Sequence, residues 1–141
     1  YHELGHVYQA QYGVLEREPA SSAENFVWQL FTEGIAMYFE QALVGNPHYY
    51  HQDKNGWLAW CERHFPQILS DFHADLSSMT PSSQRYFGDW CSYHGWGDTG
   101  YYLGARFVRH LTETHPFDTL LGLEIQPVFD LYKEFVKRYQ L

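Results

Sequence analysis

Apolar residues recur every three or four positions along four stretches of the chain, at residues 1–12, 23–43, 99–114 and 127–139. This spacing places the apolar side chains on one face of an α-helix. The longest stretch carries the clearest pattern, and its expected buried face consists of Val27, Leu30, Phe31, Gly34, Ile35, Tyr38 and Ala42. The pattern predicts a mainly α-helical fold.

Capping and breaking residues set the expected ends of the longest helix. Ser21 or Ser22 can cap it, because a serine hydroxyl accepts a hydrogen bond from a free N–H group of the first turn. The sequence Gly45-Asn46-Pro47 ends it, since these residues favour turns over helices.

The middle of the chain is less regular. Residues 56–77 have a helical composition, but Pro66 disfavours helical geometry in the preceding residue, so Phe65 is an expected break or kink. Residues 77–97 have no sustained period and are rich in aromatic side chains. A loop of this length usually has a function, and we expect it to approach the metal cleft described below and form one of its walls. Asp98 is expected to cap the helix that follows it.

Composition narrows the class of protein. A chain of 141 residues with 45% hydrophobic content fits one globular domain. A formal net charge of −8 argues against a nucleic-acid partner, and no apolar run approaches the roughly 20 residues that a membrane-spanning helix needs. The two cysteines, Cys61 and Cys91, could form one disulfide, which their spacing alone does not decide. Neither lies in a Cys-x-x-Cys arrangement, and we expect buried free thiols.

The first predicted helix carries a His-Glu-x-x-His motif formed by His2, Glu3 and His6. Residues four apart in a helix lie on one face, so both imidazoles can reach a single Zn²⁺ ion. Glu3 would point to the flank of that face, where its carboxylate can take a proton from a metal-bound water. The spacing therefore predicts a catalytic zinc site, which normally has three protein ligands and an open fourth position.

Glu33 is the candidate third ligand. It lies on a line of helical spacing with Phe26, Leu30 and Met37, which are all apolar. A lone carboxylate on such a line is costly to bury unless a cation meets it, and zinc is one such cation. The alternatives are a solvated carboxylate on the flank of the helix or an ion pair with an arginine. Gly34, beside the candidate ligand, would allow the first helix to approach closely.

The two motif stretches resemble the gluzincin clan of zinc metallopeptidases. His2-Glu-Leu-Gly-His6 followed by Thr32-Glu-Gly-Ile-Ala-Met-Tyr-Phe-Glu40 is similar to the histidine helix and the glutamate helix of that clan, with twenty-six residues between His6 and Glu33. The later stretch Asp98-Thr-Gly-Tyr-Tyr-Leu-Gly resembles a helix of a bacterial group of predicted zinc-dependent proteases of uncharacterised function. The resemblance implies a zinc-dependent hydrolase whose substrate is a peptide or protein.

The chain begins at Tyr1, inside the metal motif. A helix that presents His2 needs preceding residues to hold its first turn. Zincins of this kind usually place a β-sheet before the motif helix. We therefore expect residues 1–141 to form a single zincin-like metallopeptidase domain that is a fragment truncated at its N-terminus and lacks that sheet.

A peptidase also needs a hydrogen-bond donor for the tetrahedral oxyanion, and in related zincins a tyrosine or histidine serves. Tyr101 is the first candidate, followed by Tyr102 or His94, and packing in the core is the alternative role for Tyr101. In some gluzincins an acidic residue four positions after the glutamate ligand orients a histidine, but this chain has Met37 there. The sequence therefore leaves that orienting group unidentified.

Two further functions stay open at this point. The same ligands would serve a zinc hydrolase that acts on a non-peptide amide or ester, and a catalytically silent domain could keep the fold for binding. The intact Glu3 argues against the silent domain, because a structural site does not need that carboxylate. His48 and His51 could form part of a second metal site, but a loop beside Asn46-Pro47 favours solvated histidines.

Overall fold

The computed structural model describes residues 2–12 and 21–139, with side chains described for residues 2–10 and 21–139. It is mainly α-helical, as the sequence predicts, and in the described part of the chain the short-range β pairing is limited to two isolated bridges. The helices are α1 (His2–Tyr12), α2 (Ser22–Val44), α3 (Trp57–Arg63), α4 (Phe65–Asp75), α5 (Thr99–Leu111), α6 (Phe117–Leu121) and α7 (Ile125–Tyr139).

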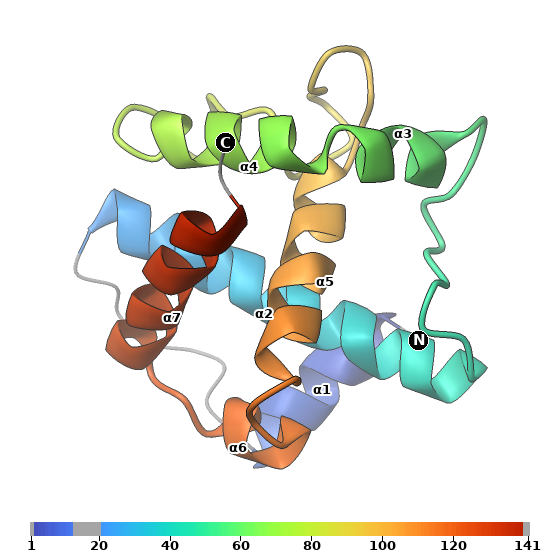
Figure 1. Cartoon of the computed structure of the whole chain (residues 1–141), viewed down its shortest axis with the longest axis vertical. Coiled ribbons are helices and arrows are strands. Elements are labelled where there is room, and N and C mark those ends of the chain that lie inside the picture. The colour runs from blue at the N-terminus through green and yellow to red at the C-terminus, as the bar shows by residue number, and fades with distance from the viewer. Residues whose placement is uncertain (1, 13–20, 140–141) are drawn as a thin grey trace.

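Helix α2 runs through the middle of the molecule, and α5 crosses it (Figure 1). α1 and α7 also pack against α2, while α4 packs against α5 and α7. Because neighbours cover α2 on several sides, side chains around much of its circumference are buried. Twelve of its residues are buried, including the polar side chains of Thr32, Glu40 and Gln41.

Local hydrogen bonds fix both ends of α2. Ser21 is the N-cap, and its Oγ accepts a hydrogen bond of 3.1 Å from the backbone N–H of Glu24. At the other end, Gly45 has a positive φ of 80°, which a residue without a Cβ adopts at little cost, and its N–H donates to the carbonyl of Gln41. The predicted cap and stop are both confirmed.

Glycines set the closest contacts of α2. A Cβ on Gly34 would lie 2.2 Å from the carbonyl oxygen of Gly104 in α5, so it is α5 that approaches at this position. The prediction that Gly34 makes room for the motif helix is wrong. That helix instead brings Gly5 against Ala36, where a Cβ on Gly5 would lie 2.6 Å from the Cα of Ala36.

Two other local predictions need correction. The break between α3 and α4 falls at His64 rather than Phe65, because Pro66 is tolerated in the first turn of a new helix that begins at Phe65. Asp98 precedes α5 as expected, but its side chain makes no capping hydrogen bond. Its backbone has a positive φ of 57°, which is not the extended geometry of a capping residue.

The loop between α4 and α5 is held by specific hydrogen bonds. The hydroxyl of Tyr86 donates to Asp75 Oδ2 at 2.7 Å, and Arg85 Nη2 donates to the same oxygen at 2.8 Å. The N–H of Gly100 donates to the carbonyl of Tyr86, and this bond joins the loop to the first turn of α5. The predicted non-helical stretch is confirmed, and these bonds fix its path. The prediction that it forms a wall of the metal cleft is wrong, because none of residues 77–97 lines the cleft that holds His2 and Glu3.

The cysteines are free thiols, as expected, although only Cys61 is buried. Both Cys61 and Cys91 are free, with Cys61 fully buried and Cys91 only half-buried. Burial raises the pKa of the Cys61 thiol to about 12. Across the described residues, no helix combines the length and the apolar character that crossing a lipid bilayer requires.

Substitution of Gly34 by alanine should destabilise the fold. The new methyl group would meet backbone atoms of α5, which cannot rotate away, so we expect the free energy of unfolding to fall by about 1–3 kcal/mol. Chemical denaturation followed by circular dichroism measures this change. Gly97→Ala is the matched control, because a Cβ there meets no atom within 4 Å. Equal stability of the two variants would contradict the close α2–α5 contact.

Candidate metal centre

Helices α1 and α2 bring the three predicted ligands together. His2 Nε2 lies 2.8 Å and His6 Nε2 lies 2.6 Å from the same carboxylate oxygen, Glu33 Oε1. The two imidazole rings have centroids 4.8 Å apart and are nearly perpendicular. The four-residue spacing on α1 places both rings over one turn of α2, so the side chains converge from two neighbouring helices.

The three side chains are partly shielded from solvent, and both histidines hydrogen-bond to the carboxylate of Glu33. Their exposed fractions are 13% for His2, 22% for His6 and 14% for Glu33. The hydrogen bond to Glu33 raises the pKa of His6 above its ordinary value. Burial alone would raise the pKa of Glu33, but hydrogen bonds from the two histidines and their charge lower it to about 2. The carboxylate is therefore held in its ionised form.

The donor set fits a zinc ion. Two imidazole nitrogens and a carboxylate oxygen are ligands that catalytic zinc sites use, at about 2.0–2.2 Å from the metal. A tetrahedral ion at that distance needs donors about 3.3 Å apart, so the pairs at 2.6 and 2.8 Å would have to spread by about half an ångström.

A cleft of about 560 Å³ opens beside this cluster. Glu3 lies on its rim and is exposed, which suits a group that exchanges protons with water. Tyr101, from the first turn of α5, also lines the cleft, and its ring centroid is 5.5 Å from that of His2. Burial, followed by the charge of Glu33, raises the pKa of Tyr101, so its hydroxyl keeps its proton at neutral pH.

The other two oxyanion candidates lie elsewhere. Tyr102 is buried in the core, where its hydroxyl oxygen accepts a hydrogen bond of 2.6 Å from Arg106 Nη1. His94 is exposed on the loop with its ring against Tyr93. Of the three candidates, Tyr101 alone is brought to the cleft, while its catalytic role stays a prediction.

The structure brings two further residues to the site: Glu40, which the sequence analysis did not select, and His51, which it weighed only for a second metal site with His48. Glu40 is buried on α2, and its Oε1 accepts a hydrogen bond of 2.7 Å from His51 Nδ1. The ring of His51 lies 5.6 Å from that of His2, and donor atoms of His2, Glu40 and His51 all lie within 4.8 Å of one another. His2 Nδ1 is buried and without a hydrogen-bond partner in the described part of the chain.

This arrangement bears on the missing orienting group. Histidines that bind zinc through one ring nitrogen usually hydrogen-bond a carboxylate or carbonyl through the other. Glu40 lies seven residues after Glu33, so both carboxylates are on one face of α2, two turns apart. An acidic residue is therefore present one turn beyond Met37, but it hydrogen-bonds His51, and His2 Nδ1 has no hydrogen-bond partner among the described residues.

The remaining histidines of the middle segment have structural contacts. His64 Nδ1 donates to the carbonyl of Trp60 at 2.8 Å, and His73 Nδ1 lies 3.1 Å from the hydroxyl of Tyr132. His48 is exposed, and it does not share a metal-binding group with His51 among the described residues. The hypothesis of a second site built on that pair finds no support in the geometry.

Comparisons with protein-family models, curated protein sequences and solved structures find no significant match for this chain. The interpretation of the site therefore depends on the residues themselves.

The pKa values of the cluster predict how its contribution to stability varies with pH. In chelator-treated protein, the raised pKa of His6 contributes stability that is complete below about pH 6.5 and is lost as the pH rises through the folded-state value. The lowered pKa of Glu33 contributes stability that is complete above about pH 4.5 and is lost as the pH falls towards 2. The stabilisation is therefore greatest between those limits.

Replacing Glu33 by glutamine should lower the pKa of His6, because the hydrogen bond and charge that raise it are weakened or lost. An NMR titration of the histidine ring protons in chelator-treated protein measures this shift. Glu24→Gln, on the same helix but outside the cluster, is the control. An unchanged His6 titration in Glu33→Gln would contradict the convergence of these side chains.

Proposed function

We propose that this chain is a zinc-dependent peptidase domain of the gluzincin type, with His2, His6 and Glu33 as metal ligands. The observation that carries the proposal is the convergence of two imidazole nitrogens on one carboxylate oxygen, at the edge of a cleft that also holds Glu3 and Tyr101. A buried ion pair alone would not need a second carboxylate and a protonated phenol beside it.

The chemistry follows from the groups in the cleft. Zinc bound by the three ligands would supply an activated water at neutral pH and polarise the carbonyl of the substrate. Glu3 would accept a proton from the attacking water and pass it to the leaving amine. Tyr101 would donate a hydrogen bond to the oxygen that becomes negative during attack, and its raised pKa keeps that donor in place.

Neighbouring residues would hold this arrangement. The ring of His51 packs at 5.6 Å from that of His2, and the hydrogen bond from His51 to Glu40 would hold His51 there. Glu33 is fixed by the α2 backbone, which is buried and capped at both ends. The ligands thus project from helices rather than from loops, which favours a preorganised metal geometry.

A peptide is the substrate class that the resemblance to the gluzincin clan implies. A zinc hydrolase of another amide or ester would use the same ligands. A digest of a peptide library at neutral pH separates the two: cleavage within peptides supports the proposal, while turnover of small esters alone supports the second function.

Replacing Glu3 by glutamine should retain zinc but remove most of the activity. Loss of a general base typically lowers kcat by about 10²–10⁴-fold, and Glu3 is not among the three ligands. Metal analysis by mass spectrometry and a chelator-reversible peptidase assay on the full-length protein provide the two measurements. His6→Ala should instead lose both zinc and activity. Unchanged turnover in Glu3→Gln would refute the assigned base.

Replacing Tyr101 by phenylalanine tests the oxyanion donor. The ring packing remains and only the hydroxyl, with its hydrogen bond to Glu33, is lost. We therefore expect zinc to be retained while kcat falls by about 10²–10³-fold with little change in KM. Tyr49→Phe is a control, since Tyr49 also lines the cleft and keeps its ring in the variant. A kcat equal to that of the unaltered protein would return Tyr101 to a packing role.

A further inference from the structure

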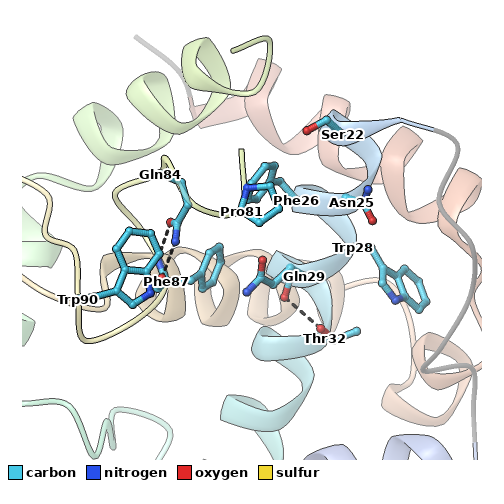
Figure 2. Close-up of a pocket in the computed structure, with 10 residues that line it drawn as sticks. All are labelled: Ser22, Asn25, Phe26, Trp28, Gln29, Thr32, Pro81, Gln84, Phe87 and Trp90. Carbon is cyan, nitrogen blue, oxygen red and sulfur yellow. Dashed lines mark hydrogen bonds between the residues drawn. The ribbon is translucent and has the colours of Figure 1, made fainter. Parts of the chain in front are cut away.

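A second and larger pocket, of about 680 Å³, lies between the N-terminal half of α2 and the loop that precedes α5 (Figure 2). Its size is in the range of pockets that bind small molecules or side chains. The residues that line it are Ser22, Asn25, Phe26, Trp28, Gln29, Thr32, Pro81, Gln84, Phe87 and Trp90.

The lining of this pocket is neutral and partly aromatic. None of these side chains carries a charge, although the chain as a whole has a formal charge of −8. Figure 2 shows Phe87 and Trp90 on the loop side, with Gln29 pointing from α2 towards Phe87. Phe87 is buried, whereas Trp90 is 58% exposed. An exposed tryptophan beside a hollow offers apolar surface that a bound ring can cover.

Most of the polar groups in the lining already serve the fold. The amide of Gln84 accepts hydrogen bonds from the N–H groups of Tyr86 and Phe87 and so holds the loop. The hydroxyl of Thr32 donates to the carbonyl of Gln29 at 3.1 Å. The Gln84 side-chain oxygen and the Thr32 hydroxyl are therefore already hydrogen-bonded and do not replace the water around a charged ligand.

The pocket neighbours the candidate metal centre, although the two hollows share no lining residue. Gln29 lies four residues before Glu33 on the same face of α2, which is about 6 Å along the helix. On the loop side, the ring of Phe87 packs edge-on against Tyr101 at 5.5 Å, and Tyr101 lies 5.5 Å from His2. An extended peptide advances about 3.3 Å per residue. A side chain within about three residues of the bond at the metal centre would therefore reach this pocket.

We propose that this pocket binds an aromatic side chain of the peptide substrate, and so directs the enzyme to bonds near phenylalanine, tyrosine or tryptophan. The proposal rests on the proposed peptidase function. Rings of Phe87 and Trp90 supply the edge and face contacts that aromatic pairs prefer. A carboxylate or ammonium group would lose its hydration there with no opposite charge in the lining, so acidic and basic side chains are disfavoured.

Binding to metal-free protein is the first test, because the pocket does not contain a metal ligand. The probes are N-acetyl-phenylalanine amide, N-acetyl-alanine amide and N-acetyl-glutamate amide, added to chelator-treated full-length protein. The readout is the indole N–H resonance of Trp90 in NMR spectra, identified by its loss in Trp90→Ala. We expect the phenylalanine probe to shift this resonance and to bind about tenfold or more tightly than the other two.

Two variants locate the binding. Trp90→Ala removes an exposed wall, and Gln29→Phe puts a ring into the space that the substrate ring would take. Gln29→Phe should lose the shift of the Trp90 resonance, and calorimetric titration should show weaker binding in both variants. Leu43→Ala is the control, since Leu43 is 49% exposed on the other end of α2 and should leave binding unchanged. Thermal melts establish that all three variants are folded.

The second test uses zinc-loaded protein and matched peptides that carry either phenylalanine or glutamate near the cleaved bond. We expect kcat/KM to favour the phenylalanine peptide by about tenfold or more, and Trp90→Ala to reduce that preference. Equal cleavage of both peptides, or failure of the phenylalanine probe to affect Trp90, would overturn the aromatic pocket. Absence of zinc and of cleavage would instead refute the peptidase, and the metal-free binding would still decide the pocket.

Discussion

The charge of Glu33 is the constraint on which the centre of this molecule depends. Its carboxylate lies on the most enclosed helix, where burial alone would favour the protonated form. Two imidazoles from α1 reverse that preference and hold the pKa of Glu33 at about 2. The contact between α1 and α2 therefore has an electrostatic requirement: the helices must stay in register for the negative charge to be met.

Helix packing supplies that register. Gly5 brings α1 against Ala36, while Gly34 and Gly104 bring α5 against the neighbouring face of α2. Since α5 carries Tyr101 at its first turn, the same close contact that fixes the core also fixes the phenol beside His2. The candidate metal ligands and the phenol thus derive from three helices whose separations are set by backbone contacts rather than by flexible side chains.

Features decided by local physics were the ones that sequence could predict. The cap at Ser21 and the stop at Gly45 depend on hydrogen bonds within one turn, and the convergence of His2 and His6 depends on helical spacing. Glycine spacing indicated that a helix comes close to Gly34 but not which helix does so. The pairing of His51 with Glu40 depends on the path of a connecting loop, which no local pattern in the sequence encodes.

Phe87 connects two parts of the molecule that would otherwise be separate. Its ring packs against Tyr101 on one side and lines the larger pocket on the other, and it stands so close to α5 that a Cβ on Gly100 would lie 2.7 Å from it. Trp90 lines the larger pocket but is largely exposed, and it does not line the cleft beside His2. A substitution at position 90 would therefore alter the larger pocket alone, whereas a substitution at position 87 would also alter the packing against Tyr101 and α5.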